Sequence, residues 1–330
     1  AASAGVKTTM NAMVYEQYGA PDVLELREID TPAVGDKDVL VQVRAAGVAA
    51  GDHHLLSADL FAVRMYQGLF APKRNVLGHD FAGTVAAVGT GVTRLKVGDA
   101  VFGESAEGGG FAEYVAVPEH HVVAKPEALS FEEAAVVPVS AITALQGLRD
   151  KGRIRAGQRV LINGASGGVG LFAVQIAKAA GAHVTGVASG SKADFVRGLG
   201  ADEVIDYRTE DFTETTGRYD AIIDTGGRHS IRRLRSVLAP GGTLVIVGGE
   251  GGNKLTGGFG RPIRAAMMSP FVGRSMPFFL STEHHDFIDR LAGHMAGGEV
   301  VPAVGQEFPL EQTSEAIRRL AAGESSGKSA

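Results

Sequence analysis

The stretch Arg159–Gly181, RVLINGASGGVGLFAVQIAKAAG, constrains the fold more than any other part of the sequence. Its apolar run Val160–Ile162 predicts a buried strand, and apolar residues at helical spacing follow a glycine-rich turn. Gly164, Gly167 and Gly170 give this turn the GxxGxxG spacing of a dinucleotide-binding fingerprint. Glycine allows the backbone to approach a pyrophosphate closely, and the positive end of the helix dipole meets the charge of the phosphates. We therefore predict a nucleotide cofactor.

The amides expected to hold the diphosphate are those of Ser166, Gly167, Gly168 and Val169. After this turn, stretches of strand and helix character alternate along the chain. The predicted strands are His183–Ala188, Val204–Asp206, Tyr219–Asp224 and Thr243–Gly248, and the predicted helices are Ser191–Leu199 and Ser230–Leu238. This alternation predicts an α/β domain with a doubly wound parallel sheet.

The first part of the chain, from Met13 to about Val123, has a different pattern of apolar and turn residues. Short alternating strands separated by Gly and Asp turns predict a compact, partly antiparallel β-barrel. These strands are Val39–Val43, Phe81–Gly89, Ala100–Gly103 and Phe111–Val117. The intervening segment Asp52–Leu77 is expected to be irregular or weakly helical and to form a wall of the substrate cleft, because loops on a rigid scaffold often carry specificity.

The remaining segments are predicted from caps and apolar spacing. Ser130 and Glu133 stand in capping-box spacing before two helices that break near Pro138. Toward the end of the chain we expect a last sheet strand, a helix, a strand and a final helix, over Ser275–Leu280, Glu283–Met295, Ala303–Phe308 and Leu310–Ala322 respectively.

Composition excludes several classes of function. The net charge is −5 and no dense Lys/Arg block occurs, which disfavours a nucleic-acid partner. The chain contains no cysteine, so disulfides and thiolate metal sites are excluded. The longest uncharged run includes four glycines, which argues against a membrane span, and the first nine residues have no apolar secretory segment. We expect these nine residues to lie outside the folded domains, and we expect a cytoplasmic protein that acts on a small molecule.

The residues that follow the second sheet strand indicate which dinucleotide is bound. NAD enzymes usually carry an acid there, whereas this chain has Ser189, Ser191 and Lys192. Hydroxyl donors and a positive charge suit a 2′-phosphate, and Tyr207 could close the same pocket. The prediction is therefore NADPH; the alternative for Lys192 is that it only begins a solvated helix.

Several separated motifs, in the same order, resemble the medium-chain dehydrogenase/reductase superfamily and its zinc-free quinone oxidoreductase-like branch. The resemblance covers nearly the whole chain from about Met10. The motifs that carry it are Gly19–Leu26, Val76–Gly83, Lys96–Gly103, Phe111–Val115, Asn163–Gly170 and Gly200–Tyr207.

This resemblance implies a GroES-like β-rich catalytic domain over residues 10–136, completed by residues 283–330, and a Rossmann NADPH-binding domain over residues 137–282. It also implies a homodimer that reduces quinones or α,β-unsaturated carbonyl compounds. Two alternatives remain open: a zinc-free alcohol dehydrogenase or biosynthetic enoyl reductase of the same fold, and a non-catalytic NADPH-binding scaffold or sensor.

The chain departs from its zinc-dependent relatives at the metal ligands. Those relatives use two cysteines and a histidine, and the matching residues here are Ala49, Ser140 and His79. Zinc needs about three protein ligands, so we predict no metal and a hydrogen-bonded structural role for His79.

Other expected site residues follow from the family pattern. Thr143 matches a nicotinamide-proximal threonine, with a helix-internal hydrogen bond as its alternative. Gly248 and Gly249 follow a sheet strand where the nicotinamide half of the cofactor should pass. Ala49 replaces a polar Asn of many quinone reductases, and Asp52 matches an acidic position that is either structural or catalytic. Catalytic residues stay unassigned: Tyr66 and His54 are candidate proton donors, for which loop packing is the alternative.

Overall fold

The computed structural model describes the chain except for residues 1–5, 59–60, 216, 228, 248–264, 268–274, 278–284 and 325–326. The chain divides into two compact units. The β-rich unit comprises residues 1–139, 283–298 and 302–330, and the α/β unit comprises residues 140–282 and 299–301.

The α/β unit is built on one five-stranded parallel sheet, as the alternation of strands and helices predicted. The strand order is β10-β9-β8-β11-β12. The strands are β8 (Arg159–Asn163), β9 (His183–Ala188), β10 (Glu203–Asp206), β11 (Tyr219–Asp224) and β12 (Leu238–Ile246). The order reverses between β8 and β11, and ligands of open α/β sheets bind at such a reversal, outside the carboxyl ends of the strands.

Helices connect these strands. The chain enters β8 through α4 (Pro138–Gln146) and a π-helical turn, η3 (Gly147–Lys151). Between the strands lie α5 (Gly168–Ala179), η4 (Gly190–Lys192), α6 (Ala193–Gly198), η5 (Phe212–Glu214) and α7 (Ile231–Ser236). Leu161, Ile222 and Leu244 are completely buried in neighbouring strands, which is the pattern of a sheet covered on both faces.

The β-rich unit contains a five-stranded antiparallel sheet and a hairpin. The sheet order is β6-β3-β4-β5-β7, and the hairpin pairs β1 with β2. The strands are β1 (Thr9–Val14), β2 (Glu25–Asp30), β3 (Asp38–Gly47), β4 (Asp80–Val88), β5 (Ala100–Glu104), β6 (Tyr114–Pro118) and β7 (Val122–Ala124). Val39, Val41, Phe81 and Val101 form one apolar core of this unit.

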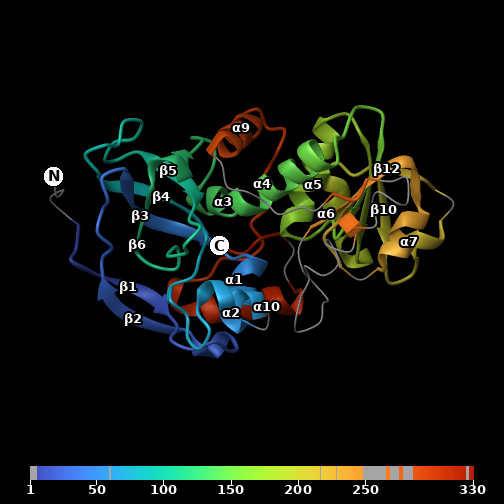
Figure 1. Ribbon diagram of the computed structural model, residues 1–330. Helices are drawn as coiled ribbons and strands as arrows, with labels where there is room; N and C mark the ends of the chain where they lie inside the picture. The colour runs from blue at the N-terminus through green and yellow to red at the C-terminus, as the bar shows by residue number, and fades with distance from the viewer. Residues whose placement is uncertain are drawn as a thin grey trace. The chain divides into compact units, whose positions relative to one another are not determined.

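Helices of the β-rich unit pack around this sheet. Three of them lie together, α1 (Ala50–Ser57), α2 (Phe61–Gln67) and α10 (Thr313–Ala322) (Figure 1). The others are α3 (Phe131–Ala135), α9 (His285–Ala296) and the short η1 (Pro21–Val23), η2 (Glu119–His121) and η7 (Leu310–Gln312). The capping box at α3 is confirmed: the Glu133 amide donates to Ser130 Oγ over 3.1 Å, and the Ser130 amide donates to Glu133 Oε2 over 2.8 Å.

Two predictions of secondary structure need correction. The segment 52–77 is more helical than expected, because α1 and α2 occupy much of it. The strand predicted at 303–308 was wrong: within this segment only Val304 forms a β-bridge, with Lys328.

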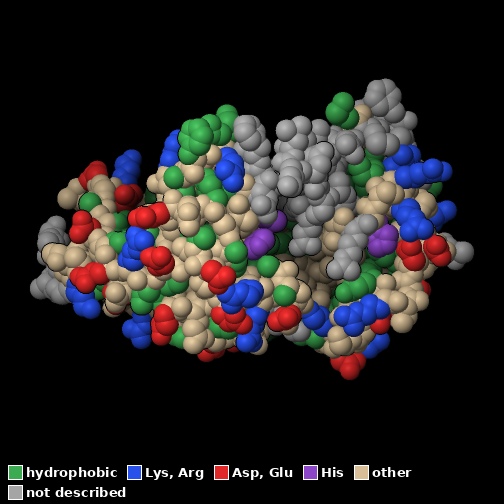
Figure 2. Space-filling model, turned by 90° about the horizontal axis from the view of Figure 1, so that it is seen from below, with side chains coloured by type: hydrophobic (Ala, Val, Ile, Leu, Met, Phe, Trp, Pro, Cys, Tyr) green, Lys and Arg blue, Asp and Glu red, His purple; other side chains and the backbone are tan. Residues whose placement is uncertain are grey.

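On the face drawn in Figure 2, acidic and basic side chains are interspersed over much of the described surface. Within the described residues, no helix is long and apolar enough to cross a membrane.

Candidate functional site

The glycine-rich turn between β8 and α5 is held by main-chain bonds. The amides of Gly164 and Ala165 donate to the Val187 carbonyl over 3.1 and 3.0 Å, which fixes the turn to the end of β9. Gly164 has φ +86°, a left-handed conformation that favours glycine. A side chain at Gly170 would collide with the Gly164 carbonyl, so this glycine permits the close approach of helix and strand.

The first turn of α5 presents its amides to solvent. Gly167 is the N-cap residue, is exposed, and contributes no side chain to cap the helix. The first amides of a helix have no partner within the helix, and here the following residues Gly168 and Val169 are also only partly buried. The Gly167 amide donates to the Gly164 carbonyl over 3.0 Å, so the amides at Gly168 and Val169 are the ones that the turn offers at the positive end of a helix of 12 residues.

A polar network that sequence reasoning missed lies where the strand order reverses. Asn163 and Asp224 are register partners at the carboxyl ends of β8 and β11. The Asn163 Nδ2 group donates to Asp224 Oδ1 over 2.7 Å, and Asp224 is fully buried. Thr225 Oγ1 donates to the Asn163 carbonyl over 2.7 Å. A polar residue at the end of each of two apolar strands, VLIN and AIID, was the available signal.

The residues predicted to select the dinucleotide occupy the same edge of the sheet. Ser189 and Lys192 follow β9, Tyr207 follows β10, and the Tyr207 amide donates to the Ala188 carbonyl over 3.2 Å. Ser189 is buried, and its hydroxyl lies 3.2 Å from Ser191 Oγ. An acid is nevertheless present: the carboxylate of Asp206, at the end of β10, lies against Gly190, where a Cβ atom would meet it.

The remaining predicted cofactor residues are Thr143, Gly248 and Gly249. Thr143 lies on α4 and is buried, at 8% exposure. Gly248 and Gly249 lie outside the described residues. The structure thus brings Gly164–Gly170, Ser189, Lys192 and Tyr207 to one edge of a single sheet.

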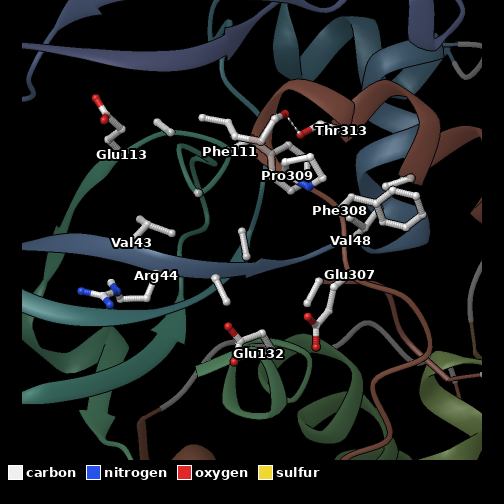
Figure 3. A pocket seen from close by; sticks show the side chains of 17 residues that line it. Val43, Arg44, Val48, Phe111, Glu113, Glu132, Glu307, Phe308, Pro309 and Thr313 are labelled. Atoms are coloured by element: carbon white, nitrogen blue, oxygen red, sulfur yellow. Dashed lines mark hydrogen bonds between the residues drawn. The ribbon is translucent and has the colours of Figure 1, made fainter. Parts of the chain in front are cut away.

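The two candidate proton donors both belong to the β-rich unit. Tyr66 is 57% exposed, and its hydroxyl accepts a hydrogen bond from Arg74 Nη1 over 3.0 Å. His54 lies on α1, with its ring 5.8 Å from that of His53. Neither lines the cavity of about 530 Å³ in this unit, whose largely apolar wall includes Val48, Phe111 and Phe308 (Figure 3). Their catalytic role stays unassigned.

His79 is hydrogen-bonded. Its Nδ1 lies 2.9 Å from Oδ1 of Asp52, which is fully buried and also accepts the amides of Ala49 and Gly78 over 2.8 and 3.1 Å. Burial raises the pKa of the nearby Tyr15 phenol, and Tyr18 and Asp52 raise it further. In the part of the chain that is described, no group of three or more His, Cys, Asp or Glu side chains could hold a metal ion.

Comparison with known proteins agrees with this architecture. Residues 35–127 match the alcohol dehydrogenase GroES-like domain, and residues 199–330 match the zinc-binding dehydrogenase family. The chain is 31% identical over 322 residues to the quinone oxidoreductase of Homo sapiens, covering 95% of this chain and 94% of the relative. It is 30% identical over 344 residues to the chloroplastic NADPH-dependent alkenal/one oxidoreductase of Arabidopsis thaliana, covering 99% and 80%.

A solved structure supports the same assignment. The quinone oxidoreductase of Coxiella burnetii has a TM-score of 0.86 and 29% sequence identity, covering 97% of this chain and 98% of that one. The fold and the amide-lined turn define an oxidoreductase of a nicotinamide-dependent family. The chain belongs to the medium-chain dehydrogenase/reductase superfamily, in its quinone oxidoreductase-like branch.

Proposed function

We propose that this protein is an NADPH-dependent reductase that transfers a hydride to a quinone or an α,β-unsaturated carbonyl compound without a metal. The observation that carries the proposal is the accessible amide-lined turn beside the reversal of strand order. Relatives named quinone oxidoreductase and alkenal/one oxidoreductase support the acceptor class.

The residues of this chain fit a dinucleotide. The amides of Ser166–Val169 would hold the diphosphate, Thr143, Gly248 and Gly249 would adjoin the nicotinamide, and Ser189, Lys192 and Tyr207 would contact the adenosine half. NADPH supplies the hydride when bound, and the protein supplies position and the exclusion of water. The preference for NADPH rests on the hydroxyl and ammonium donors that follow β9.

The residues do not fit a catalytic zinc. Of the three positions that bind zinc in relatives, Ala49 has no donor, Ser140 offers only a hydroxyl, and His79 alone keeps the side chain of a usual zinc ligand. A single imidazole falls short of the three protein ligands that a catalytic zinc usually has. Charge on the acceptor carbonyl must then be met by N–H groups, a hydroxyl or solvent.

We further propose a cytoplasmic homodimer with a small-molecule substrate. Ser275 extends the sheet beyond β12, because the Leu244 amide donates to its carbonyl over 2.9 Å, and an uncovered sheet edge can pair with a second copy. Residues 278–280 of the predicted edge strand lie outside the described residues. Light scattering tests the dimer, and a mass of one chain would refute it.

The function is tested by incubating the pure protein with NADPH and a panel of quinones, enones and enals, and following the absorbance of the reduced nicotinamide. We expect acceptor-dependent oxidation of NADPH. Stabilisation by NADPH in a thermal-shift assay, with no acceptor reduced, would identify the scaffold alternative instead. Turnover of simple alcohols with NADP would identify the alcohol dehydrogenase alternative.

A further inference from the structure

A polar cavity of about 480 Å³ lies in the α/β unit, at the edge of the sheet opposite the glycine-rich turn. Residues before β8 line one side, and Asp220 at the start of β11 and Gly241 and Thr243 of β12 line the other. The turn that follows Asn163 is at the carboxyl end of β8. A five-residue strand is about 16 Å long, so this cavity and the turn are separate places.

Three cations line this cavity: Lys151, Arg153 and Arg155. Among the described residues, no hydrogen bond, ion pair or ring contact engages their side-chain charges. The two acids of the lining, Asp150 and Asp220, are already engaged. Asp150 Oδ1 lies 2.7 Å from Arg149 Nε, and Asp220 Oδ2 accepts the Arg159 amide over 2.8 Å. Asp150 is thus paired with a cation, whereas the bond to a neutral amide leaves the negative charge of Asp220 in place. The three cations still give the lining a net positive charge.

The backbone adds to this arrangement. Arg153 has φ +51°, a left-handed conformation that residues with a side chain rarely adopt. The Gln158 Oε1 atom accepts the Arg155 amide over 2.8 Å, which leaves the Gln158 Nε2 donor on a residue that also lines the cavity. Guanidinium, ammonium and amide donors thus surround one volume that lies within the range of small-ligand sites.

Another group of basic residues in the same unit differs in this respect. On and near α7, Arg233 is paired with Asp211 at 2.9 Å and with Glu214 at 3.5 Å. Arg218 donates to the Ser236 carbonyl. Because two carboxylates already match the charge of Arg233, clustering of arginines alone does not distinguish the cavity; unmatched charge around a volume does.

We infer that this cavity is a second ligand site, distinct from the cofactor turn, for a small oxyanion with at least two negative charges. Phosphate esters and polycarboxylates share that chemistry, and the planar guanidinium forks of Arg153 and Arg155 suit either one. The inference does not depend on the proposed reductase activity.

The experiment is a calorimetric titration of the full chain with inorganic pyrophosphate, and separately with citrate, at low ionic strength. Hydrogen exchange read by mass spectrometry locates the bound anion. We expect saturable binding and slowed exchange in the segment 147–158. Replacing both Lys151→Gln and Arg155→Gln should weaken this binding about tenfold or more, since each removes a charge-assisted contact. Arg155→Lys, which keeps the charge, should retain part of it.

The matched control is Arg232→Gln, an exposed arginine of the same unit outside the cavity, and it should bind as the unchanged protein does. Thermal melting of each variant verifies that it is folded. Slowed exchange confined to residues 164–170 would show that pyrophosphate binds only at the cofactor turn, and would overturn the inference. Equal weakening by Arg232→Gln would overturn it as well, by showing a response to net charge alone. Binding of citrate but not pyrophosphate, or the reverse, would assign the ligand to one of the two sources.

Discussion

Asn163 and Asp224 join the two strands between which the order of the parallel sheet reverses. The amide of Asn163 donates to the buried carboxylate of Asp224 over 2.7 Å, one residue before the glycine-rich turn begins. Thr225 then bonds the Asn163 carbonyl, so the start of the turn is fixed by the neighbouring strand. This network therefore fixes the start of the turn that we propose to hold the cofactor, even though neither residue is a glycine of the fingerprint.

Replacing Asn163→Ala should therefore weaken both stability and cofactor binding. The buried Asp224 carboxylate loses one donor, which should lower the free energy of unfolding by about 2 kcal/mol, and the turn loses its anchor. The measurement is urea denaturation together with the KM for NADPH. Gln175→Ala is the control, because Gln175 bonds Val301 away from the turn. It should lower stability but leave KM unchanged; an equal rise of KM in both variants would contradict the positioning role.

Gly167→Asp should separate cofactor binding from folding. A Cβ atom at this position would meet only the Gly164 carbonyl, at 3.4 Å, and φ is −82°, so a side chain is tolerated. Aspartate is a favourable N-cap, but its charge would occupy the amides expected to hold the diphosphate. We expect an unchanged or higher melting temperature and at least about tenfold weaker NADPH binding. Gly167→Ala is the neutral control, and undiminished binding by the Asp variant would exclude this turn as the diphosphate site.

Lys328→Met should destabilise the β-rich unit strongly. Lys328 Nζ lies 2.5 Å from Asp80 Oδ2, and both side chains are almost completely buried. Removing one partner leaves an unpaired buried charge, a change that costs about 3–5 kcal/mol. Asp80→Asn in the same chain removes that charge and should restore most of the stability in urea denaturation. A double variant as unstable as Lys328→Met would show that packing, and not the charge, is responsible.

The sequence predicts those strands and helices in which apolar residues recur at a regular spacing. The strand Val160–Ile162 and the helix after the glycine-rich turn were correct, because buried strands and amphipathic helices leave regular apolar spacing. The capping box of Ser130 was also predicted correctly, since its partner Glu133 is only three residues away in the sequence. By contrast, the lone bridge of Val304 to Lys328 joins two residues that are far apart in the sequence, and no local pattern predicts it.

In the candidate site, too, local sequence patterns were predicted and contacts between residues distant in the sequence were not. Glycines at fixed spacing could be read directly, whereas the contact of Asn163 with Asp224 joins residues that are 61 positions apart. The sequence does not indicate Asp206 as a cofactor residue, because the expected acid stands at the end of the second sheet strand and this one stands at the end of the third. Parallel pairing aligns Asp206 with Ala188, next to the loop that carries Ser189, and that alignment appears only once the sheet is assembled.

The choice between NADPH and NADH should respond to Lys192 and Asp206 in opposite directions. Lys192→Ala removes a positive charge from the loop after β9. It should weaken the binding of NADPH by about 1.5–3 kcal/mol, which is much more than its effect on the binding of NADH. Asp206→Asn removes a negative charge beside the same loop, and should favour NADPH, whose extra phosphate is then repelled less. Binding of both dinucleotides to each variant is measured by fluorescence. Equal changes for the two cofactors would show that Lys192 does not contact the phosphate.

Asp202 should make the α/β unit sensitive to acid. A hydrogen bond from Lys178 Nζ, 2.6 Å away, lowers the pKa of this carboxyl, and the Val184 amide lowers it further. A carboxyl whose pKa is lower in the folded state stabilises the fold above its unfolded pKa of about 4, and this stabilisation is lost as the pH falls through the folded pKa. Asp202→Asn should therefore melt at a lower temperature near pH 7, while the difference from the unchanged protein disappears toward pH 2. Asp194→Asn is the charge-matched control, because that carboxylate is fully exposed and its ion pair with Arg197 contributes little. Calorimetric melts across this pH range test the sign of the effect. A difference in melting temperature between Asp202→Asn and the unchanged protein that persists at low pH would show that packing is responsible.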